Sequence, residues 1–380
     1  MKLRCPICGR TYEEPVQRCS CGEPVEFKIL KGEPYIGKSV WERFWNFWPI
    51  EPVLEFSLGE GDTPLVKSRL GEELGIRLYL KNETANPTWS FKDRGTFLAV
   101  SYAIKAGYKA VGTVSTGNMA ASVAAYAARA GLSAKILVSE NADEEKLKAV
   151  SVYGGSVIRV RGDYGRLYFE SLKLGENLGV YFINSDNPFR VEGYKGIAFE
   201  IAEETTPDYV LIPTSSGGLF RGIAKGFIEL MRNGLIEELP KLITVQAKGC
   251  SPICRAFREG KARIEHFERP KTIAKAIANP YPPSGNAVLK LLREFNWLCV
   301  TVSDEGIIEA QKKLAGEGLF VQPASATGIA ALKKLVESGT IPEGTKVVSI
   351  LTGSGLKTLS HMEGGGIMEC AIGNLEKCLR

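Results

Sequence analysis

The sequence has few of the residues on which several common enzyme mechanisms depend. Only two of its 380 residues are histidine, His266 and His361, and neither lies in a pattern typical of a metal site or a nucleophile–base pair. No G-x-G-x-x-G opens a helix after a strand, and no G-x-x-x-x-G-K-[ST] occurs. Dinucleotide binding and P-loop phosphoryl transfer are therefore not indicated.

Long apolar runs and a large charge imbalance are also absent. No stretch reaches the about 18 consecutive apolar residues that a membrane-spanning helix needs, and residues 1–8 have no apolar signal-peptide core. Lys and Arg total 48 against 43 Asp and Glu, without a concentrated basic patch, which argues against nucleic-acid binding. With 44% hydrophobic residues, we expect a globular cytoplasmic protein that binds neither nucleic acid nor membrane.

Cysteine is sparse except at the amino terminus, where four of the nine cysteines fall within 21 residues. Four thiolates can satisfy a tetrahedral zinc ion, and the glycine that follows each pair allows a tight turn around a metal. This spacing predicts a structural zinc ribbon over residues 1–30, although unligated thiols or a redox-switching disulfide also fit it. The proposed ligands are Cys5, Cys8, Cys19 and Cys21.

A tryptophan-rich segment separates this ribbon from the rest of the chain. Trp41, Phe44, Trp45 and Trp48 recur at helical spacing, and prolines follow shortly afterwards. Such a stripe usually packs into a core rather than stacking on a ligand. We expect an aromatic helical linker over residues 31–55.

The remaining sequence alternates between β-branched apolar runs and helical patterns. This alternation predicts parallel sheets covered by helices, with ligands beyond the carboxyl ends of the strands. Gly107, Gly131 and Gly175 stand where helices are expected to end. The predicted strands are 78–80, 110–114, 134–138, 156–160, 180–183, 209–212, 242–246, 299–302 and 346–351.

The loop after strand 78–80 contains a lysine with unusual surroundings. Ser90 and Asp93 have the spacing of a capping box, which predicts a helix with Lys92 in its first turn. The positive end of the helix dipole and partial burial would both favour the neutral amine. A neutral amine is what Schiff-base chemistry requires, although an exposed first-turn lysine also fits the pattern.

Two other loops offer anion-binding groups at predicted helix starts. Residues 115–118 (Ser-Thr-Gly-Asn) follow strand 110–114 and present hydroxyls, an amide and free backbone N–H groups. Residues 214–218 (Thr-Ser-Ser-Gly-Gly) follow strand 209–212, where glycine allows an anion to approach the backbone closely. The second loop is therefore expected to bind a phosphate.

Together with residues 317–326 and 351–357, these motifs resemble pyridoxal-phosphate enzymes of fold type II, and within them the threonine synthase family. The resemblance covers residues 55–358. It implies two open, mostly parallel sheets covered by helices, with the cofactor between two domains. The implied division is a large cofactor-binding domain over 56–94 and 190–358, a small mobile domain over 95–189, and a tail over 359–380, in a homodimer.

The resemblance also implies roles for single residues. Lys92 would hold pyridoxal phosphate covalently and later move protons at Cα and Cβ of the substrate. Asn118 would bond the pyridine hydroxyl oxygen, and Thr352 would face the ring nitrogen and leave it uncharged. The cofactor phosphate would be held by Ser215, Ser216, Gly217 and Gly218, and the substrate carboxylate by Ser115, Thr116 and Gly117.

The loop after strand 180–183 has the composition of a second anion site, although a solvated basic turn would look similar. In the resembling family its residues would clamp the substrate phosphate. The implied reaction converts O-phospho-L-homoserine and water into L-threonine and phosphate, which makes the enzyme a lyase. The implied clamp residues are Asn184, Ser185, Arg190 and Lys195.

Three positions depart from the family pattern, because Thr214 and Ser216 stand in a loop that is often richer in glycine and Gln322 replaces a glutamate. Three alternatives therefore stay open. A cysteate synthase-like enzyme would use O-phosphoserine and sulfite, a serine or threonine dehydratase would not need the clamp, and a zinc-ribbon binding module would have an inert body.

Overall fold

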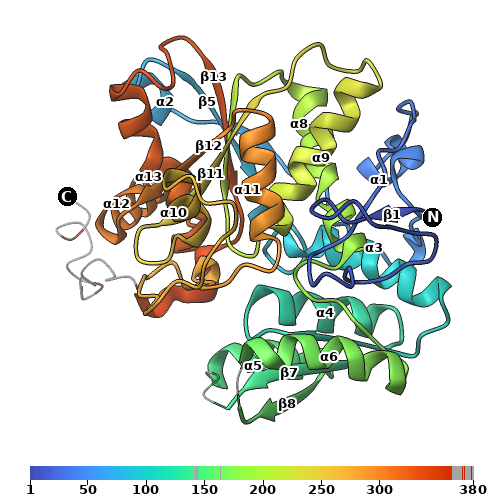
Figure 1. The fold of residues 1–380 in the computed structure, drawn as a ribbon. Helices are drawn as coiled ribbons and strands as arrows, with labels where there is room; N and C mark the ends of the chain where they lie inside the picture. The colour runs from blue at the N-terminus through green and yellow to red at the C-terminus, as the bar shows by residue number, and fades with distance from the viewer. Residues whose placement is uncertain are drawn as a thin grey trace.

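The computed structural model describes residues 1–140, 142, 144–162, 164–361, 370, 372 and 378. Strands in this part of the chain form three sheets. A six-stranded sheet lies in the upper half of the molecule in Figure 1 and a four-stranded sheet in the lower half. The small third sheet belongs to the amino-terminal segment, drawn in dark blue.

The six-stranded sheet has the order β12–β11–β10–β13–β5–β4 and is parallel except for the antiparallel β4–β5 pair. Its central strand β10 is buried along its whole length, as expected for a strand covered on both faces. The bounds are β4 Leu65–Lys67, β5 Arg77–Asn82, β10 Tyr209–Pro213, β11 Lys241–Ala247, β12 Leu298–Val302 and β13 Lys346–Leu351.

The four-stranded sheet has the order β8–β7–β6–β9 and is parallel throughout. All nine predicted strands are present in the two large sheets. The sequence did not predict β4, because three residues are too short to show an alternating pattern. The bounds are β6 Ala110–Val114, β7 Ser133–Ser139, β8 Ser156–Val160 and β9 Val180–Phe182.

Helices cover both large sheets. The positive φ angles of Gly107 and Gly131 confirm the predicted helix ends, but Gly175 lies inside α6 and Gly179 follows its end. A side chain at Gly175 would come within 2.5 Å of the Val180 carbonyl oxygen, so close packing explains this glycine. The helices are α2 Leu70–Glu73, α3 Lys92–Lys105, α4 Asn118–Arg129, α5 Glu144–Val152, α6 Tyr164–Leu178, α7 Pro188–Gly193, α8 Lys195–Glu204, α9 Gly218–Arg232, α10 Pro252–Arg258, α11 Gly285–Glu294, α12 Asp304–Gly316 and α13 Pro323–Glu337.

The aromatic segment forms two short helices, α1 Val40–Arg43 and a 3-10 turn over Trp45–Phe47, instead of one continuous helix. Its packing agrees with the prediction, because Trp41, Phe44 and Trp48 are buried. The Phe44 ring stacks on Phe199 of α8 with 4.4 Å between centroids. Burial of these rings holds the segment against the large sheet.

The amino-terminal segment forms the antiparallel sheet β2–β1–β3 around the four clustered cysteines. Elsewhere, disulfides join Cys254 to Cys299 and Cys370 to Cys378. Most of the predicted tail 359–380 lies outside the described residues. None of the described helices combines the length and apolar character needed to cross a bilayer. The bounds of the small strands are β1 Leu3–Arg4, β2 Thr11–Tyr12 and β3 Glu26–Phe27.

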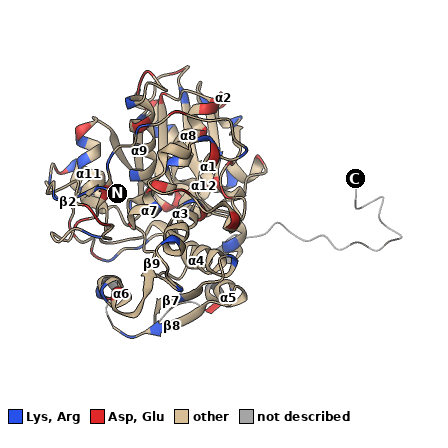
Figure 2. Cartoon of the chain, turned by 90° about the vertical axis from the view of Figure 1, so that its right-hand side faces the viewer, with Lys and Arg blue, Asp and Glu red and all other residues tan. Residues whose placement is uncertain are grey.

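Charged side chains of both signs are distributed over the whole chain, as Figure 2 shows. The most deeply buried ones form ion pairs. Arg94 of α3 is fully buried and donates to Glu83 at 2.7 Å and to Glu200 at 2.5 and 2.7 Å. Removing one partner of such a group would leave an uncompensated buried charge, so this network fixes α3 against α8.

Candidate functional site

Lys92 is the first residue of α3, as predicted, and lies where two loops of the large sheet meet. The Phe91 N–H donates to the Thr352 carbonyl oxygen at 3.1 Å, and Ser90 forms a β-bridge with Gly353. These bonds place the start of α3 beside the carboxyl end of β13. The Lys92 Nζ atom lies 4.4 Å from the centroid of the Phe91 ring.

The predicted capping box at Ser90 and Asp93 is wrong. The Asp93 carboxylate accepts hydrogen bonds from the Thr88 N–H and hydroxyl, both at 2.6 Å, and does not reach back to the helix start. Ser90 is fully buried, and its hydroxyl has no hydrogen-bond partner in the described part of the chain. A buried hydroxyl without a partner is costly, so this group is available to a ligand.

The amine of Lys92 is held close to neutrality. Burial and the nearby Arg190 guanidinium lower its pKa to about 7. Both causes act against the charged form, the first through loss of hydration and the second through repulsion between like charges. At pH values above about 7 the amine is therefore mainly neutral and able to act as a nucleophile.

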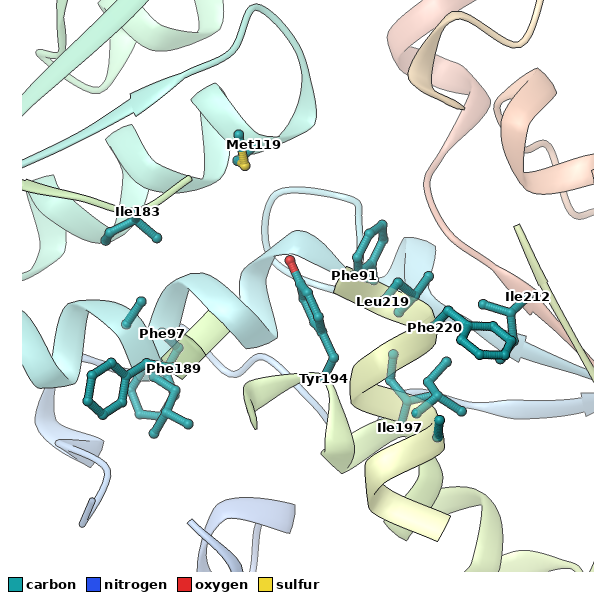
Figure 3. Close-up of a cluster of buried hydrophobic side chains, with 14 of the residues drawn as sticks. Phe91, Phe97, Met119, Ile183, Phe189, Tyr194, Ile197, Ile212, Leu219 and Phe220 are labelled. Atoms are coloured by element: carbon teal, nitrogen blue, oxygen red, sulfur yellow. The ribbon is translucent and has the colours of Figure 1, made fainter. Parts of the chain in front are cut away.

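Arg190 lies on α7 and is fully buried next to the start of α3. Its guanidinium donates to the Tyr194 hydroxyl at 2.9 Å, the Thr96 hydroxyl at 2.9 Å and the Lys92 carbonyl oxygen at 3.3 Å. Figure 3 shows Tyr194 and Phe91 between α3 and α9. No carboxylate pairs with Arg190 among the ion pairs of the described residues, so these residues leave its charge without an opposite partner.

The loop at the start of α9 has the form of a phosphate cradle. Gly217 has a φ of 92°, a left-handed conformation that favours glycine. A side chain at Gly218 would come within 2.6 Å of the Ser185 carbonyl oxygen. The Thr214 hydroxyl donates back to the Ile212 carbonyl oxygen at 2.8 Å, so this threonine does not obstruct the cradle. Ser216 is held by Asn279, which donates to its hydroxyl at 3.1 Å.

Asn118 begins α4, in the region of the four-stranded sheet, yet its side chain contacts loops of the larger sheet. Its side-chain amide donates to the side-chain oxygen Oε1 of Gln322 at 2.8 Å, and its own side-chain oxygen accepts from the Lys357 ammonium at 3.2 Å. Burial lowers the pKa of Lys357 to about 8, although Asp93 opposes this shift. The sequence motifs contained Gln322 and Lys357 but gave no sign of this contact.

Thr352 follows β13, and its hydroxyl lies 2.9 Å from the hydroxyl of Ser325. Ser325 is fully buried and also accepts from the Gly353 N–H at 2.9 Å. The polar group at this strand end is thus a hydroxyl oriented by another hydroxyl. Ser325 lies within the 317–326 motif, but its orienting role depends on contacts with residues 352 and 353, which the motif does not indicate.

The predicted substrate residues are only partly brought together. Residues 115–117 lie at the start of α4 beside Asn118, with Ser115 and Thr116 half-buried and Gly117 exposed. Asn184 is buried, and its side-chain oxygen accepts from the Val114 N–H at 2.9 Å. It therefore shapes the loop that carries Ser185, whose carbonyl oxygen packs on the start of α9.

Lys195 is not available to an anionic ligand. Its fully buried ammonium lies 2.6 Å from Glu192, 2.8 Å from Glu229 and 2.5 Å from the Phe47 carbonyl oxygen. Three oxygens satisfy the three N–H donors of an ammonium group. These contacts argue against its predicted place in the substrate clamp, because its partners come from α7, α9 and the aromatic segment.

The described residues fit a pyridoxal phosphate group. Lys92 supplies a near-neutral amine, the start of α9 supplies backbone N–H groups for a phosphate, and Thr352 ends a strand with a hydroxyl. The orphaned Ser90 hydroxyl provides a further polar contact in the same region. The chemistry of these donors matches the phosphate, aldehyde and ring of the cofactor.

Comparisons with known proteins agree with this geometry. Residues 56–353 match the family model described as pyridoxal-phosphate dependent enzyme. The chain is 41% identical to a threonine synthase of Methanocaldococcus jannaschii over 377 residues, covering 94% of this chain and 93% of that protein. It is 36% identical to a threonine synthase of Methanosarcina acetivorans, covering 93% and 92% of the two chains.

Solved structures share the fold. A threonine deaminase from T.th. has a TM-score of 0.65 and 27% identity, covering 80% of this chain and 94% of that chain. A maize serine racemase has a TM-score of 0.68 at 23% identity, covering 83% and 91%, and shows the fold alone. Family match, curated relatives and site geometry agree, so the chain belongs to the threonine synthases within the pyridoxal-phosphate dependent enzyme family.

Proposed function

We propose that the chain converts O-phospho-L-homoserine and water into L-threonine and phosphate. The curated relatives named above support this activity. The observation that carries the proposal is the fully buried Arg190 guanidinium beside Lys92, which has no carboxylate partner among the ion pairs of the described residues. A buried guanidinium without an anion is costly, and a phosphate matches its planar donors.

The proposed phosphate clamp consists of Arg190, on α7, and Ser185, in the preceding loop. Asn184 stabilises the conformation of that loop. Lys195 is left out because its ammonium is saturated by two carboxylates and a carbonyl oxygen. Arg190 contacts the carbonyl oxygen of Lys92 and its charge lowers the pKa of the Lys92 amine, so a phosphate bound to Arg190 would lie in the region of the reacting amine. This arrangement favours a substrate that carries its phosphate on a short side chain.

The cofactor would be held by the residues that the sequence indicated. Lys92 would attach to it, Asn118 would bond its hydroxyl oxygen, and Thr352 would face its ring nitrogen. Its phosphate would be held by Ser215, Ser216, Gly217 and Gly218. When bound, pyridoxal phosphate supplies an electron sink that allows the attached amino acid to lose its Cα proton.

The residues of this chain would then direct the reaction. Lys92, once its amine is released, would accept the Cα proton, pass it to the bound cofactor and then accept a proton from Cβ, so that the amine carries one added proton at a time. Arg190 would stabilise the negative charge on phosphate as it leaves from Cγ. Lys92 would return the proton taken from Cβ to Cγ, water would give its hydroxyl to Cβ and its proton to the departing phosphate, and Lys92 would finally move the first proton from the cofactor back to Cα. The Ser115, Thr116 and Gly117 loop would hold the substrate carboxylate throughout.

We further propose that residues 95–189 move as a small domain against 56–94 and 190–358. The separation of the two large sheets supports this division. The site draws on loops from both sheets, so closure would exclude bulk water from the reacting atoms. Water exclusion matters because an early release of the intermediate would yield a keto acid instead of threonine.

The four-cysteine cluster is proposed to bind a structural zinc ion. Four thiolates at about 2.3 Å from a tetrahedral zinc lie about 3.8 Å from one another. The Sγ atoms of Cys5 and Cys21 are 3.7 Å apart, those of Cys8 and Cys19 are 3.5 Å apart, and all four lie within 4.8 Å of one another. Four protein ligands leave no open position, so the metal would not take part in catalysis.

The substrate is tested first by product analysis of the cofactor-loaded protein. With O-phosphohomoserine alone, we expect threonine and phosphate in equal amounts. With O-phosphoserine and sulfite, we expect little cysteate, because the relatives that share 36–41% identity with this chain are threonine synthases. Cysteate from the second mixture without threonine from the first would move the protein to the cysteate synthase-like activity.

The pH dependence of cofactor attachment tests the Lys92 amine. Below about pH 7 the amine is protonated and unreactive, so the rate of reattachment to the apoprotein should rise with pH around a midpoint near 7. The visible absorbance of the bound cofactor follows this rate. Lys92→Ala should give no such absorbance, and Arg190→Gln should move the midpoint upward by removing a repelling charge. A wild-type midpoint near 10 would contradict the assignment.

Arg190 variants test the clamp. Truncating a buried charged partner of an anion typically costs about 2–5 kcal/mol, so Arg190→Gln should lower kcat/KM for O-phosphohomoserine on the order of 100-fold. Activity on L-serine, which has no phosphate, should fall much less and serves as the internal control. Equal losses on both substrates would show that Arg190 acts only through Lys92.

Metal removal tests the amino-terminal cluster. A chelator should release stoichiometric zinc and lower the melting temperature, because the small segment loses the bonds that join its two cysteine pairs. Cys5→Ser should have the same effect. Cys250→Ser is the matched control, since this buried free cysteine lies outside the cluster and its loss should leave the zinc content unchanged.

A further inference from the structure

Residues 184–187, the loop between β9 and α7, are called the clamp loop because they carry Ser185 of the proposed phosphate clamp. The amino-terminal segment contacts this loop. Asp186, between Ser185 and Asn187, has a side chain only 2% exposed, and its carboxylate pairs with the Arg18 guanidinium. Asn187 donates from its amide to Gln17 at 3.4 Å and to the Tyr181 hydroxyl at 2.8 Å. Two consecutive loop residues thus face two consecutive residues of the cysteine-containing segment.

Arg18 connects four parts of the molecule. Besides Asp186, its guanidinium donates to the Gly22 carbonyl oxygen at 3.1 Å and to the Pro283 carbonyl oxygen at 3.4 Å. It also lies 5.4 Å from the centroid of the Phe169 ring on α6. The side chain is 12% exposed, so these contacts replace most of its hydration. A single group therefore joins the amino-terminal segment to the clamp loop, to α6 and to the chain before α11.

The segment that carries Arg18 is itself fixed to the large sheet's helices. Lys225 of α9 donates to the Phe27 carbonyl oxygen at 2.7 Å, and Arg221 of α9 donates to the Val25 carbonyl oxygen at 3.1 Å. Asn286 of α11 donates to Glu23 at 2.7 Å. Helix α9 begins at the phosphate cradle. The segment that carries Arg18 is therefore anchored near the start of α9, at the end that carries the proposed phosphate cradle.

The clamp loop has little room to move. The Ser185 carbonyl oxygen lies where a side chain at Gly218 would come within 2.6 Å, so the loop packs on the backbone at the start of α9. Without Arg18, the buried Asp186 carboxylate would have no charged partner. Its hydration would then favour a conformation in which the loop has moved away from α9. Ser185 and the start of α7, which carries Arg190, would move with it.

We propose that Arg18 is a positioning residue for the substrate phosphate and that the amino-terminal segment acts as part of the active-site scaffold through it. The proposal rests on the proposed function for the identity of the substrate. It does not require Arg18 to touch substrate or cofactor. It assigns to this segment an effect on substrate binding in addition to any effect on stability.

The test compares cofactor-loaded Arg18→Gln, Arg18→Lys and Asp186→Asn with the wild type. We expect Arg18→Gln and Asp186→Asn to raise KM for O-phosphohomoserine about 10-fold or more, with a small change in kcat and an unchanged cofactor dissociation constant. Arg18→Lys should restore part of the affinity. Arg4→Gln is the matched control, because Arg4 pairs with Glu26 at the exposed surface of the same segment and should leave KM unchanged.

Hydrogen exchange of the amides in residues 184–191, measured without substrate, provides a second readout. It should become faster in Arg18→Gln and Asp186→Asn but not in Arg4→Gln. A folded Arg18→Gln protein with wild-type KM, or with unchanged exchange in this loop, would overturn the proposal. If the wild type made no threonine, the proposed function would fail, and the exchange comparison alone would decide the positioning role.

Discussion

The site depends on keeping one lysine amine neutral beside a buried guanidinium group. Burial and the Arg190 guanidinium lower the pKa of Lys92 to about 7, and this works only if no carboxylate reaches the amine. The chain meets this condition locally. Asp93, the next residue, turns its carboxylate to Thr88, and Glu83 is engaged by Arg94. The anion that the Arg190 guanidinium can attract is then that of a ligand.

The two buried arginines near the start of α3 differ in whether a carboxylate neutralises the guanidinium charge. Arg94 binds Glu83 and Glu200, and the paired charges lower the pKa of Glu200 to about 2 despite its burial. Arg190 instead donates to two hydroxyls and a carbonyl oxygen. Neutral oxygens orient a guanidinium without cancelling its charge. Arg94 thus stabilises the fold, whereas Arg190 retains charge for an anion.

Most of the fold could be predicted because buried parallel strands are continuous apolar runs bounded by glycine and proline, and their carboxyl ends locate the ligand loops. Side-chain partners could not be predicted in the same way. The sequence predicted Lys195 as a phosphate ligand, but in the structure its ammonium bonds the carboxylate of Glu229, 34 residues later in the chain. The motif spacing at Ser90 and Asp93 suggested a helix cap, but Thr88 competes for the carboxylate. Tertiary contacts therefore determine which partner each of these side chains bonds.

The same limit explains why the amino-terminal segment appeared to be a separate module. Its cysteine spacing indicated a metal, but nothing in the spacing indicated Arg18 as a contact to Asp186, 168 residues away. The close approaches at Gly218 and Gly353 are equally non-local, since a side chain at Gly353 would lie 3.2 Å from the Asn118 amide nitrogen. Loops from both large sheets therefore touch at two points. Because packed groups shift together rather than singly, a change at Arg18 reaches the clamp loop through Asp186, while the contacts of Val25 and Phe27 with α9 keep the rest of the segment in place.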